Sequence, residues 1–247
     1  MSRRRRDPKR AMVLAAGFGK RMRPITETLP KPLVRVNGEA MLDRILDRLV
    51  EAGVKKAVIN LHHLGKAIEA HLEDRKTPEI VFSPEEEILE TGGGVKKALP
   101  LLGKEPFFVV NGDVLWLDGR SSALRRLAES WDGRKMDCLL LLHQCVFAYG
   151  YEGLGDFFLD PAGVVRRRRE REVAPFVFGG MQIIDPKLFD AMPEGPFSLN
   201  RIYDLAAQRG RLHGICHDGE WFHVGTPEDL KFAEDAMHHM SVPAIHR

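Results

Sequence analysis

The segment with the clearest capacity for chemistry is a glycine-containing loop rich in basic residues. Gly17 and Gly19 follow a short apolar run, and four cations accompany them: Lys20, Arg21, Arg23 and Lys31. Glycine lets backbone N–H groups approach a phosphate closely, and clustered cations suit a polyphosphate undergoing phosphoryl or nucleotidyl transfer. The loop is neither a dinucleotide fingerprint, because Met22 occupies the third glycine position, nor a Walker A motif. A glycine turn by itself is also typical of an ordinary loop, so the neighbouring residues must distinguish a phosphate-binding loop from a structural one.

A second candidate is Asp113, which follows the apolar run 107–110 and the dipeptide Asn111-Gly112. A carboxylate at the carboxyl end of a strand, facing phosphates, is a natural ligand for Mg²⁺. Asn-Gly-Asp is also a strong turn sequence, so a purely structural role is the alternative.

The elements that must position these residues alternate along the first half of the chain. We expect strands at 11–16, 58–61, 80–82 and 107–110, and helices at 40–52, 65–72 and 95–102. Such alternation implies right-handed βαβ units and a parallel sheet, in which ligands bind beyond the carboxyl ends of the strands. In the second half we expect strands at 139–142, 176–184, 212–216 and 221–224, and a strand–turn–strand unit at 157–165. Helices are expected at 121–131, 199–209 and from 226.

Composition and charge exclude several classes of protein. The 247 residues are 44% hydrophobic, which allows a sizeable core, and 37 basic residues nearly balance 35 acidic ones. This balance argues against a surface built to coat nucleic acid. Three cysteines are too few for a disulfide scaffold and favour the cytoplasm, and no apolar run is long enough for a membrane helix. We expect a basic, disordered arm at 1–10 and one α/β domain at 11–247.

Five segments together resemble the sugar-1-phosphate nucleotidyltransferase family. They are LAAGFGKRMRP at 14–24, LPKPL at 29–33, LETGGG at 89–94, VNGD at 110–113 and WFHVGTPE at 221–228. The resemblance covers nearly all of the chain after the basic arm. It implies a Rossmann-like three-layer sandwich with a mixed, mostly parallel sheet. The N-terminal half would bind the nucleotide and the C-terminal half the sugar phosphate.

The resemblance also implies roles for individual residues. Arg21 matches the family's arginine on the β- and γ-phosphates, Lys31 its lysine at the reacting α-phosphate, and Asp113 its metal ligand. Gly92 and Gly93 match a loop lying against the nucleobase, and three glycines before a helix would permit such contact. Asn200, Gly155 and Asp156 are the expected contacts to the sugar phosphate. The expected nucleotide-binding residues are Leu14, Ala15, Ala16, Gly17, Gly19, Lys20, Glu90, Gly92, Gly93 and Asn111.

His223 departs from the family pattern, which has a second metal-binding carboxylate at this position. Mg²⁺ prefers oxygen ligands and often keeps several waters. Three interpretations follow. His223 could bind a metal, with Mn²⁺ favoured over Mg²⁺; it could contact a phosphate; or Asp113 and the substrate phosphates hold Mg²⁺ without it. We favour the third, with His223 still lining the site.

The resemblance implies transfer of a nucleotidyl group from a nucleoside triphosphate to a sugar 1-phosphate, with release of pyrophosphate. Similarity to short bacterial members that act in cell-wall recycling favours UTP and N-acetylmuramate 1-phosphate. The alternatives are mannose 1-phosphate with GTP, glucose 1-phosphate, or phosphocholine with CTP. Two further hypotheses are a non-catalytic nucleotide-sugar sensor whose metal site has decayed at His223, and a nucleic-acid-binding protein that uses the basic arm. The oligomeric state stays open.

Overall fold

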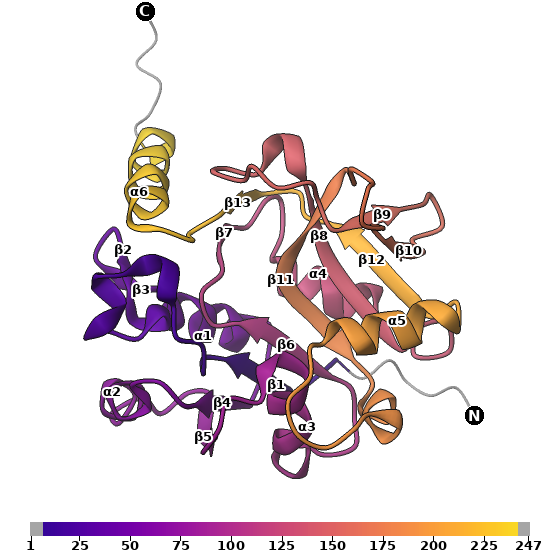
Figure 1. Ribbon diagram of the computed structural model, residues 1–247, viewed down its shortest axis with the longest axis horizontal. Helices are drawn as coiled ribbons and strands as arrows, with labels where there is room; N and C mark the ends of the chain where they lie inside the picture. The colour runs from indigo at the N-terminus through magenta and orange to yellow at the C-terminus, as the bar shows by residue number, and fades with distance from the viewer. Residues whose placement is uncertain (1–6, 242–247) are drawn as a thin grey trace, which may run out of the picture.

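The computed structural model describes residues 7–241, and its centre is a nine-stranded mixed sheet (Figure 1). Seven of its strands lie in the order β10-β9-β11-β6-β1-β4-β5, and β8 joins β11 to β12. The sheet strands are β1 (Arg10–Leu14), β4 (Lys56–Leu61), β5 (Glu79–Pro84), β6 (Phe107–Asn111), β8 (Cys138–Gln144), β9 (Phe157–Leu159), β10 (Val165–Arg167), β11 (Phe176–Ile184) and β12 (Leu212–Cys216).

The first half forms the parallel part of the sheet, as its alternating pattern predicts. β1 pairs in parallel with β4 and β6, and β4 pairs in parallel with β5. The carboxyl ends of these four strands therefore meet at one edge of the sheet. The helices that connect them are α1 (Met41–Glu51), α2 (Gly65–His71) and α3 (Glu90–Leu102).

Helices cover both faces of the sheet. On one face, α1, α2 and α4 (Ala123–Ser130) pack with Ala11 and Val13 of β1; on the other, α3 and α5 (Asn200–Gln208) pack with Met12. Successive β1 side chains thus enter opposite cores, as expected of a strand buried on both faces. The three-layer sandwich with a mixed, mostly parallel sheet is confirmed. Among residues 7–241, no helix combines the length and the apolar character needed to cross a membrane.

Two small antiparallel ribbons and a terminal helix lie beside the main sheet. β7 (Leu115–Leu117) pairs with β13 (Glu220–Phe222), and β2 (Arg35–Val36) pairs with β3 (Glu39–Ala40). α6 (Pro227–Ser241) follows β13 and lies next to β2 and β3 in Figure 1. Apolar side chains from α6 and both ribbons share a third core with Met22, so the chain's C-terminal helix covers the loop after β1.

At both ends of β1 the sequence-based boundary differs from the structure. The expected basic arm ends at residue 10, but Arg10 is already the first residue of β1, and its guanidinium donates to the Leu102 carbonyl at 2.7 Å. Residues 1–6 of that arm lie outside the described residues. The expected strand 11–16 ends instead at Leu14, because the next backbone N–H, that of Ala15, donates to the Asn60 side chain at 2.7 Å.

The expectation that Gly92, Gly93 and Gly94 precede a helix is wrong, since all three lie in the first turns of α3. The backbone N–H groups of Gly92 and Gly93 both donate to the Phe197 carbonyl, at 2.8 and 3.1 Å. A Cβ at Gly92 would collide with the Phe197 ring, and one at Gly93 with the Gly195 carbonyl. These glycines therefore let the segment before α5 press directly against α3.

Replacing Gly93 with alanine should destabilise the fold, because the added methyl group meets a backbone carbonyl that has little room to move. We expect the free energy of unfolding to fall by about 1–3 kcal/mol, the usual cost of overpacking. Denaturant titration measures this change. Gly133→Ala is the matched control, because the nearest atom to its added Cβ lies 3.6 Å away. Equal stabilities of the two variants would contradict the packing role of Gly93.

Candidate active site

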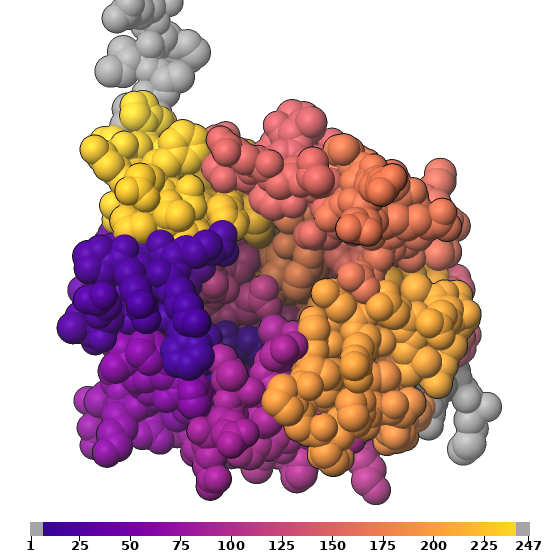
Figure 2. All heavy atoms as spheres, viewed as in Figure 1, coloured from indigo at the N-terminus to yellow at the C-terminus, as the bar shows by residue number. Residues whose placement is uncertain are grey.

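A cavity of about 600 Å³ opens at the carboxyl ends of β1, β4, β5 and β6. In the space-filling view it is the hollow between the indigo loop of the first half and the orange segment before α5 (Figure 2). Most of its wall comes from the first half of the chain. The lining residues are Leu14, Ala15, Ala16, Gly17, Gly19, Lys20, Arg21, Met22, Lys31, Pro32, Asn60, Glu85, Ile88, Glu90, Thr91, Asn111, Asp113, Ser198 and Gly225.

The glycine loop is fixed at one end and open at the other. Gly19 has a left-handed φ of 60°, and its carbonyl accepts from the Thr26 hydroxyl at 2.8 Å and from the Met22 N–H at 2.8 Å. Met22 is fully buried, which anchors the loop. At Gly17, by contrast, an added Cβ would have no neighbouring atom within 4 Å, so a side chain there would point into open space. The loop thus offers a rigid backbone surface next to the cations.

The two groups that sequence spacing singles out most strongly meet in the cavity. Lys31 Nζ lies 2.6 Å from Asp113 Oδ2, with side chains 12% and 40% exposed. Gly112 makes this approach possible, because its N–H donates to the Leu14 carbonyl at 2.8 Å and a Cβ there would lie 2.6 Å from that oxygen. The chain after β6 is therefore held against the end of β1. A paired cation and carboxylate face the cavity from neighbouring loops.

A buried amide–carboxylate pair links the glycine loop to the loop before α3. Asn60, 3% exposed, accepts from the Ala15 N–H and donates to Glu85 Oε1, each at 2.7 Å. Glu85, 5% exposed, also accepts from the Leu89 N–H at 3.0 Å. A Cβ at Gly94 would lie 2.7 Å from Glu85 Oε1, so the third glycine makes room for the pair. Sequence reasoning missed both residues; at Asn60 the available signal was an amide side chain inside the otherwise apolar strand 58–61.

Other predicted binding residues do not line the cavity. Gly92 and Gly93 are covered by the segment 195–197, whereas Glu90 and Thr91 line the cavity instead. Gly155 is buried, and a Cβ there would collide with the Ala174 carbonyl; Asp156 Oδ2 accepts from the Phe178 N–H at 2.9 Å. Asn200 is exposed at the start of α5. From the second half, the cavity receives Ser198 and Gly225.

His223 stands at the edge of the site beside Arg21 and Asp229. A Cβ at Gly225 would lie 2.6 Å from His223 Nε2 and 3.2 Å from an Arg21 guanidinium nitrogen, so these side chains converge there. Burial lowers the pKa of His223, the Asp229 carboxylate opposes that change, and Arg21 and Lys31 add to it. At neutral pH the imidazole is therefore uncharged and able to donate or accept a hydrogen bond.

Asp229 has a separate structural task. It accepts from the N–H groups of Gly225 and Thr226, both at 2.9 Å, while its own N–H donates to the Thr226 hydroxyl at 3.2 Å. This reciprocal arrangement is a capping box, which starts α6. Thr226 is thus the N-cap of α6.

No three His, Cys, Asp or Glu side chains within residues 7–241 are grouped so that they could hold a metal ion by themselves. The carboxylates that line the cavity are Asp113, whose side chain is 40% exposed, Glu85 and Glu90, and His223 stands at the cavity edge. A hard cation bound here would have to take most of its ligands from bound phosphates and water.

Taken together, the parallel part of the sheet, the glycine loop at its carboxyl edge and the flanking cations define a nucleotide-binding α/β protein of the phosphate-transferring class. Comparison with known sequences makes this specific. The chain belongs to the nucleotidyl transferase family, whose model matches residues 10–156. The predicted family is thereby confirmed.

Two curated relatives extend over nearly the whole chain. N-acetylmuramate alpha-1-phosphate uridylyltransferase of Caulobacter vibrioides is 44% identical over 232 residues, which cover 92% of this chain and 96% of that protein. The protein of the same name from Neisseria meningitidis serogroup B is 39% identical over 229 residues, covering 91% and 96%. A crystal structure of UDP-glucose pyrophosphorylase complexed with UDP-glucose superposes with a TM-score of 0.77 at 18% identity, covering 94% of this chain and 99% of that one. That likeness concerns the fold.

Proposed function

We propose that this chain transfers a uridylyl group from UTP to N-acetylmuramate 1-phosphate, releasing pyrophosphate. The observation that carries the proposal is the Lys31–Asp113 pair, which faces a cavity walled by the glycine loop and Arg21. Relatives that are 44% and 39% identical over nearly the whole chain carry the name of this activity, which supports the choice of base and sugar.

In the proposed reaction, an oxygen of the sugar 1-phosphate attacks the α-phosphorus of UTP in line. The bond from that phosphorus to the bridging oxygen breaks, and pyrophosphate leaves with the bonding electrons. No covalent enzyme intermediate is needed, because the acceptor phosphate is already an anionic nucleophile. The chain must bring two anions together and offset their repulsion. Lys31 serves at the α-phosphate and Arg21 at the departing pyrophosphate.

The nucleotide would extend from the glycine loop to the wall formed by Glu85, Ile88 and Thr91. The Asn60–Glu85 pair ties these two surfaces together, so the base and phosphate subsites keep a fixed separation. The sugar phosphate would enter from the side of Ser198. The roles first expected for Gly92, Gly93, Gly155, Asp156 and Asn200 are not part of the proposal. A triphosphate-consuming reaction and three free thiols within the described residues fit the cytoplasm.

The residues present could hold Mg²⁺ through the Asp113 carboxylate. Asp113 offers a single hard oxygen ligand on the cavity wall, and Mg²⁺ commonly takes one or two carboxylates together with substrate phosphates and water. When bound there, Mg²⁺ would neutralise phosphate charge as the leaving group departs. Lys31, which now pairs with Asp113, would then be free to turn its charge to the α-phosphate.

A substrate panel tests the proposal. Purified protein with Mg²⁺ is given UTP, CTP, GTP or dTTP together with N-acetylmuramate 1-phosphate, mannose 1-phosphate, glucose 1-phosphate or phosphocholine, and pyrophosphate release is followed. N-acetylglucosamine 1-phosphate is the matched acceptor control, because it lacks only the lactyl ether. We expect the highest kcat/KM with UTP and N-acetylmuramate 1-phosphate. A higher kcat/KM with another pair would assign that pair as the substrates instead. No pyrophosphate release from any pair would favour a nucleotide-sugar sensor.

Substitution of His223 tests how the departure from the family's carboxylate affects metal use. If His223 only lines the site, His223→Asp should lower the Mg²⁺ concentration needed for half-maximal activity by about tenfold, since it adds an oxygen ligand. His223→Ala should leave the ratio of activity with Mg²⁺ to that with Mn²⁺ unchanged. Loss of Mn²⁺-supported activity in His223→Ala alone would show that His223 binds the metal.

A further inference from the structure

The ribbon of β7 and β13 brings together two residues that lie far apart in the sequence. β7 begins just after Asp113 and β13 ends just before His223. The strands are antiparallel, and their ladder ends with Phe222 opposite Leu115; the next N–H, that of His223, donates to the Tyr149 carbonyl at 2.8 Å. Asp113 and His223 therefore leave the ribbon at the same end, and the charge of Asp113 acts on the His223 imidazole. The ribbon therefore brings the segment that carries His223 next to the segment that carries Asp113.

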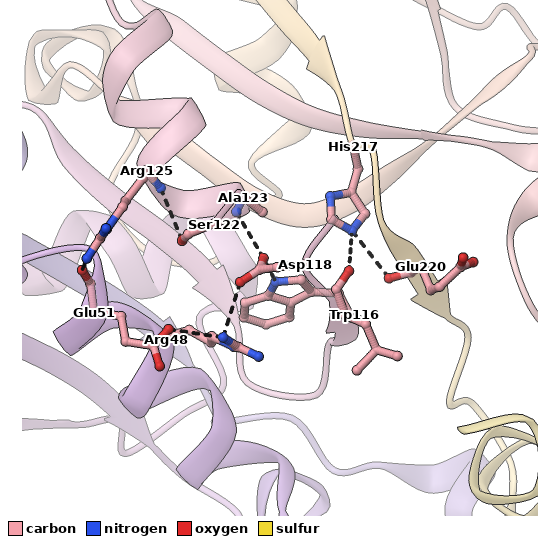
Figure 3. A network of polar contacts seen from close by, with 10 residues as sticks. Arg48, Glu51, Trp116, Asp118, Ser122, Ala123, Arg125, His217 and Glu220 are labelled. Atoms are coloured by element: carbon pink, nitrogen blue, oxygen red, sulfur yellow. Dashed lines mark hydrogen bonds and ion pairs between the residues drawn. The ribbon is translucent and has the colours of Figure 1, made fainter. Parts of the chain in front are cut away.

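His217 fastens the opposite end of the ribbon. Its Nε2 lies 3.0 Å from the Leu117 carbonyl on β7 and 3.3 Å from the Glu220 carbonyl on β13 (Figure 3). Both partners are acceptors, so Nε2 carries the hydrogen and donates to both strands. The residue is only 4% exposed, and water does not compete for these bonds. One imidazole thus spans the two strands where the ribbon ends.

The same end of β7 is also tied to the helices. The Trp116 indole N–H and the Ala123 N–H each donate to Asp118 Oδ1 at 2.9 Å, and Arg48 of α1 pairs with Asp118 Oδ2 at 3.3 Å (Figure 3). The connection beside His217 has no spare room, because a Cβ at Gly219 would collide with the Leu117 carbonyl. β7 is therefore anchored to the domain, and His217 links β13 to it. On its other side β13 is held by Tyr149, whose N–H donates to the Trp221 carbonyl at 3.0 Å.

We propose that His217 is a positioning residue for the transfer reaction: by donating to Leu117 and Glu220 it holds the β7–β13 ribbon in register, and thereby places His223 beside Arg21, the residue assigned to the departing pyrophosphate. His217 itself lies outside the cavity and contacts neither substrate. This inference rests on the proposed function for its catalytic readout. It predicts that kcat depends on a hydrogen-bond donor at position 217, whereas binding of the triphosphate by the loop at 14–21 does not.

The test compares His217→Leu, which removes the donor, with His217→Gln, whose side-chain amide can donate to the same carbonyls. We expect His217→Leu to lower kcat by about tenfold to a hundredfold, since small misplacements at a reacting centre cost this much, with KM for the triphosphate within about twofold. His217→Gln should restore kcat to within about threefold of the unchanged protein. Hydrogen exchange at the amides of β7 and β13 should quicken in His217→Leu and stay slow in His217→Gln.

His143→Leu is the matched control. Its ring lies 5.7 Å from that of His217 between centroids and is as deeply buried, but within the described structure it forms no hydrogen bond to either ribbon strand. It should lower thermal stability with kcat retained. If His217→Leu does not fold, His217→Asn, whose amide is too short to span both carbonyls, replaces it.

Two results would overturn the inference. One is an unchanged kcat in His217→Leu, and the other is a loss of kcat in His143→Leu and in His217→Gln as large as the loss in His217→Leu. If the unchanged protein releases no pyrophosphate, the proposed function fails instead. The exchange comparison then still decides whether His217 orders the ribbon, and equal exchange in both His217 variants would refute that.

Discussion

Replacing Lys31 with alanine is expected to lower kcat by about a hundredfold to a thousandfold, the usual loss when one preorganised charge at a reacting phosphate is removed. Lys31 is mostly buried at the cavity wall, and Asp113 is its ion-pair partner within the described structure. A bound triphosphate would compete for the same ammonium group. The loss should therefore fall mainly on kcat, because the charge matters most as the α-phosphate reacts.

The fold should survive this substitution. Asp113 is 40% exposed, so its carboxylate stays hydrated when Lys31 is removed. Lys66→Ala is the matched control, because this lysine is exposed on α2. Steady-state rates and thermal unfolding of both variants distinguish a catalytic role of Lys31 from a structural one. A Lys31→Ala variant with the control's kcat would remove Lys31 from the mechanism, and an unfolded variant would make its role structural.

Asp113→Asn is expected to lower Mg²⁺-dependent turnover by at least about a hundredfold, because the amide keeps the shape of the side chain but loses the negative charge that attracts the metal. Rates measured over a wide range of Mg²⁺ concentrations test this. Excess Mg²⁺ should restore activity only in part. Asp74 is an exposed aspartate after α2, so Asp74→Asn serves as the control. Its rate should depend on Mg²⁺ concentration as that of the unchanged protein does.

The double variant Lys31→Ala with Asp113→Asn separates two explanations. The two side chains lie 2.6 Å apart, so their effects should not add. If both residues act together in the same catalytic step, kcat of the double variant should be only slightly lower than kcat of the slower single variant. Activity that recovers in the double variant would mean that each single variant merely leaves a charge unpaired.

Local patterns predicted most of the first half of the fold correctly. Buried strands such as Phe107–Asn111 read as apolar runs, and α1 shows apolar residues at helical spacing before Gly53, which has the left-handed φ of a helix end. Because parallel strands direct their carboxyl ends to one edge, Gly17, Lys31 and Asp113 could be expected to meet there. The cavity lining and the Lys31–Asp113 contact are consistent with that expectation.

Features set by contacts between distant segments escaped prediction. The glycines at 92–94 resemble a flexible loop, yet they lie in α3, where the segment 195–197 covers Gly92 and Gly93 and the Asn60–Glu85 pair lies against Gly94. β11 enters between β6 and β8 against the direction of both, which no local pattern reveals. In the β7–β13 ribbon, the sequence predicted a strand at 221–224 where β13 lies, but it did not predict the three-residue β7.

The roles of individual polar and glycine residues were also hard to predict from local sequence. Gly155 and Asp156 look like polar loop residues, but they serve the backbone around β9 and β11, where Asp156 accepts from Phe178. Asn60 looks like an ordinary strand residue, yet pairing with Glu85 across two strands makes it part of the cavity wall. In both cases a side chain's role depends on which distant segment folds against it.

The most direct test of the proposed reaction is ³¹P NMR of the protein with UTP, N-acetylmuramate 1-phosphate and Mg²⁺. The expected result is equal growth of two signals, the coupled diphosphate doublets of the nucleotide-sugar and the singlet of pyrophosphate, as both substrate signals decline. Uridine diphosphate and inorganic phosphate appearing instead would mean hydrolysis, and unchanged substrate signals would mean that no transfer occurs; either result would contradict the proposed function.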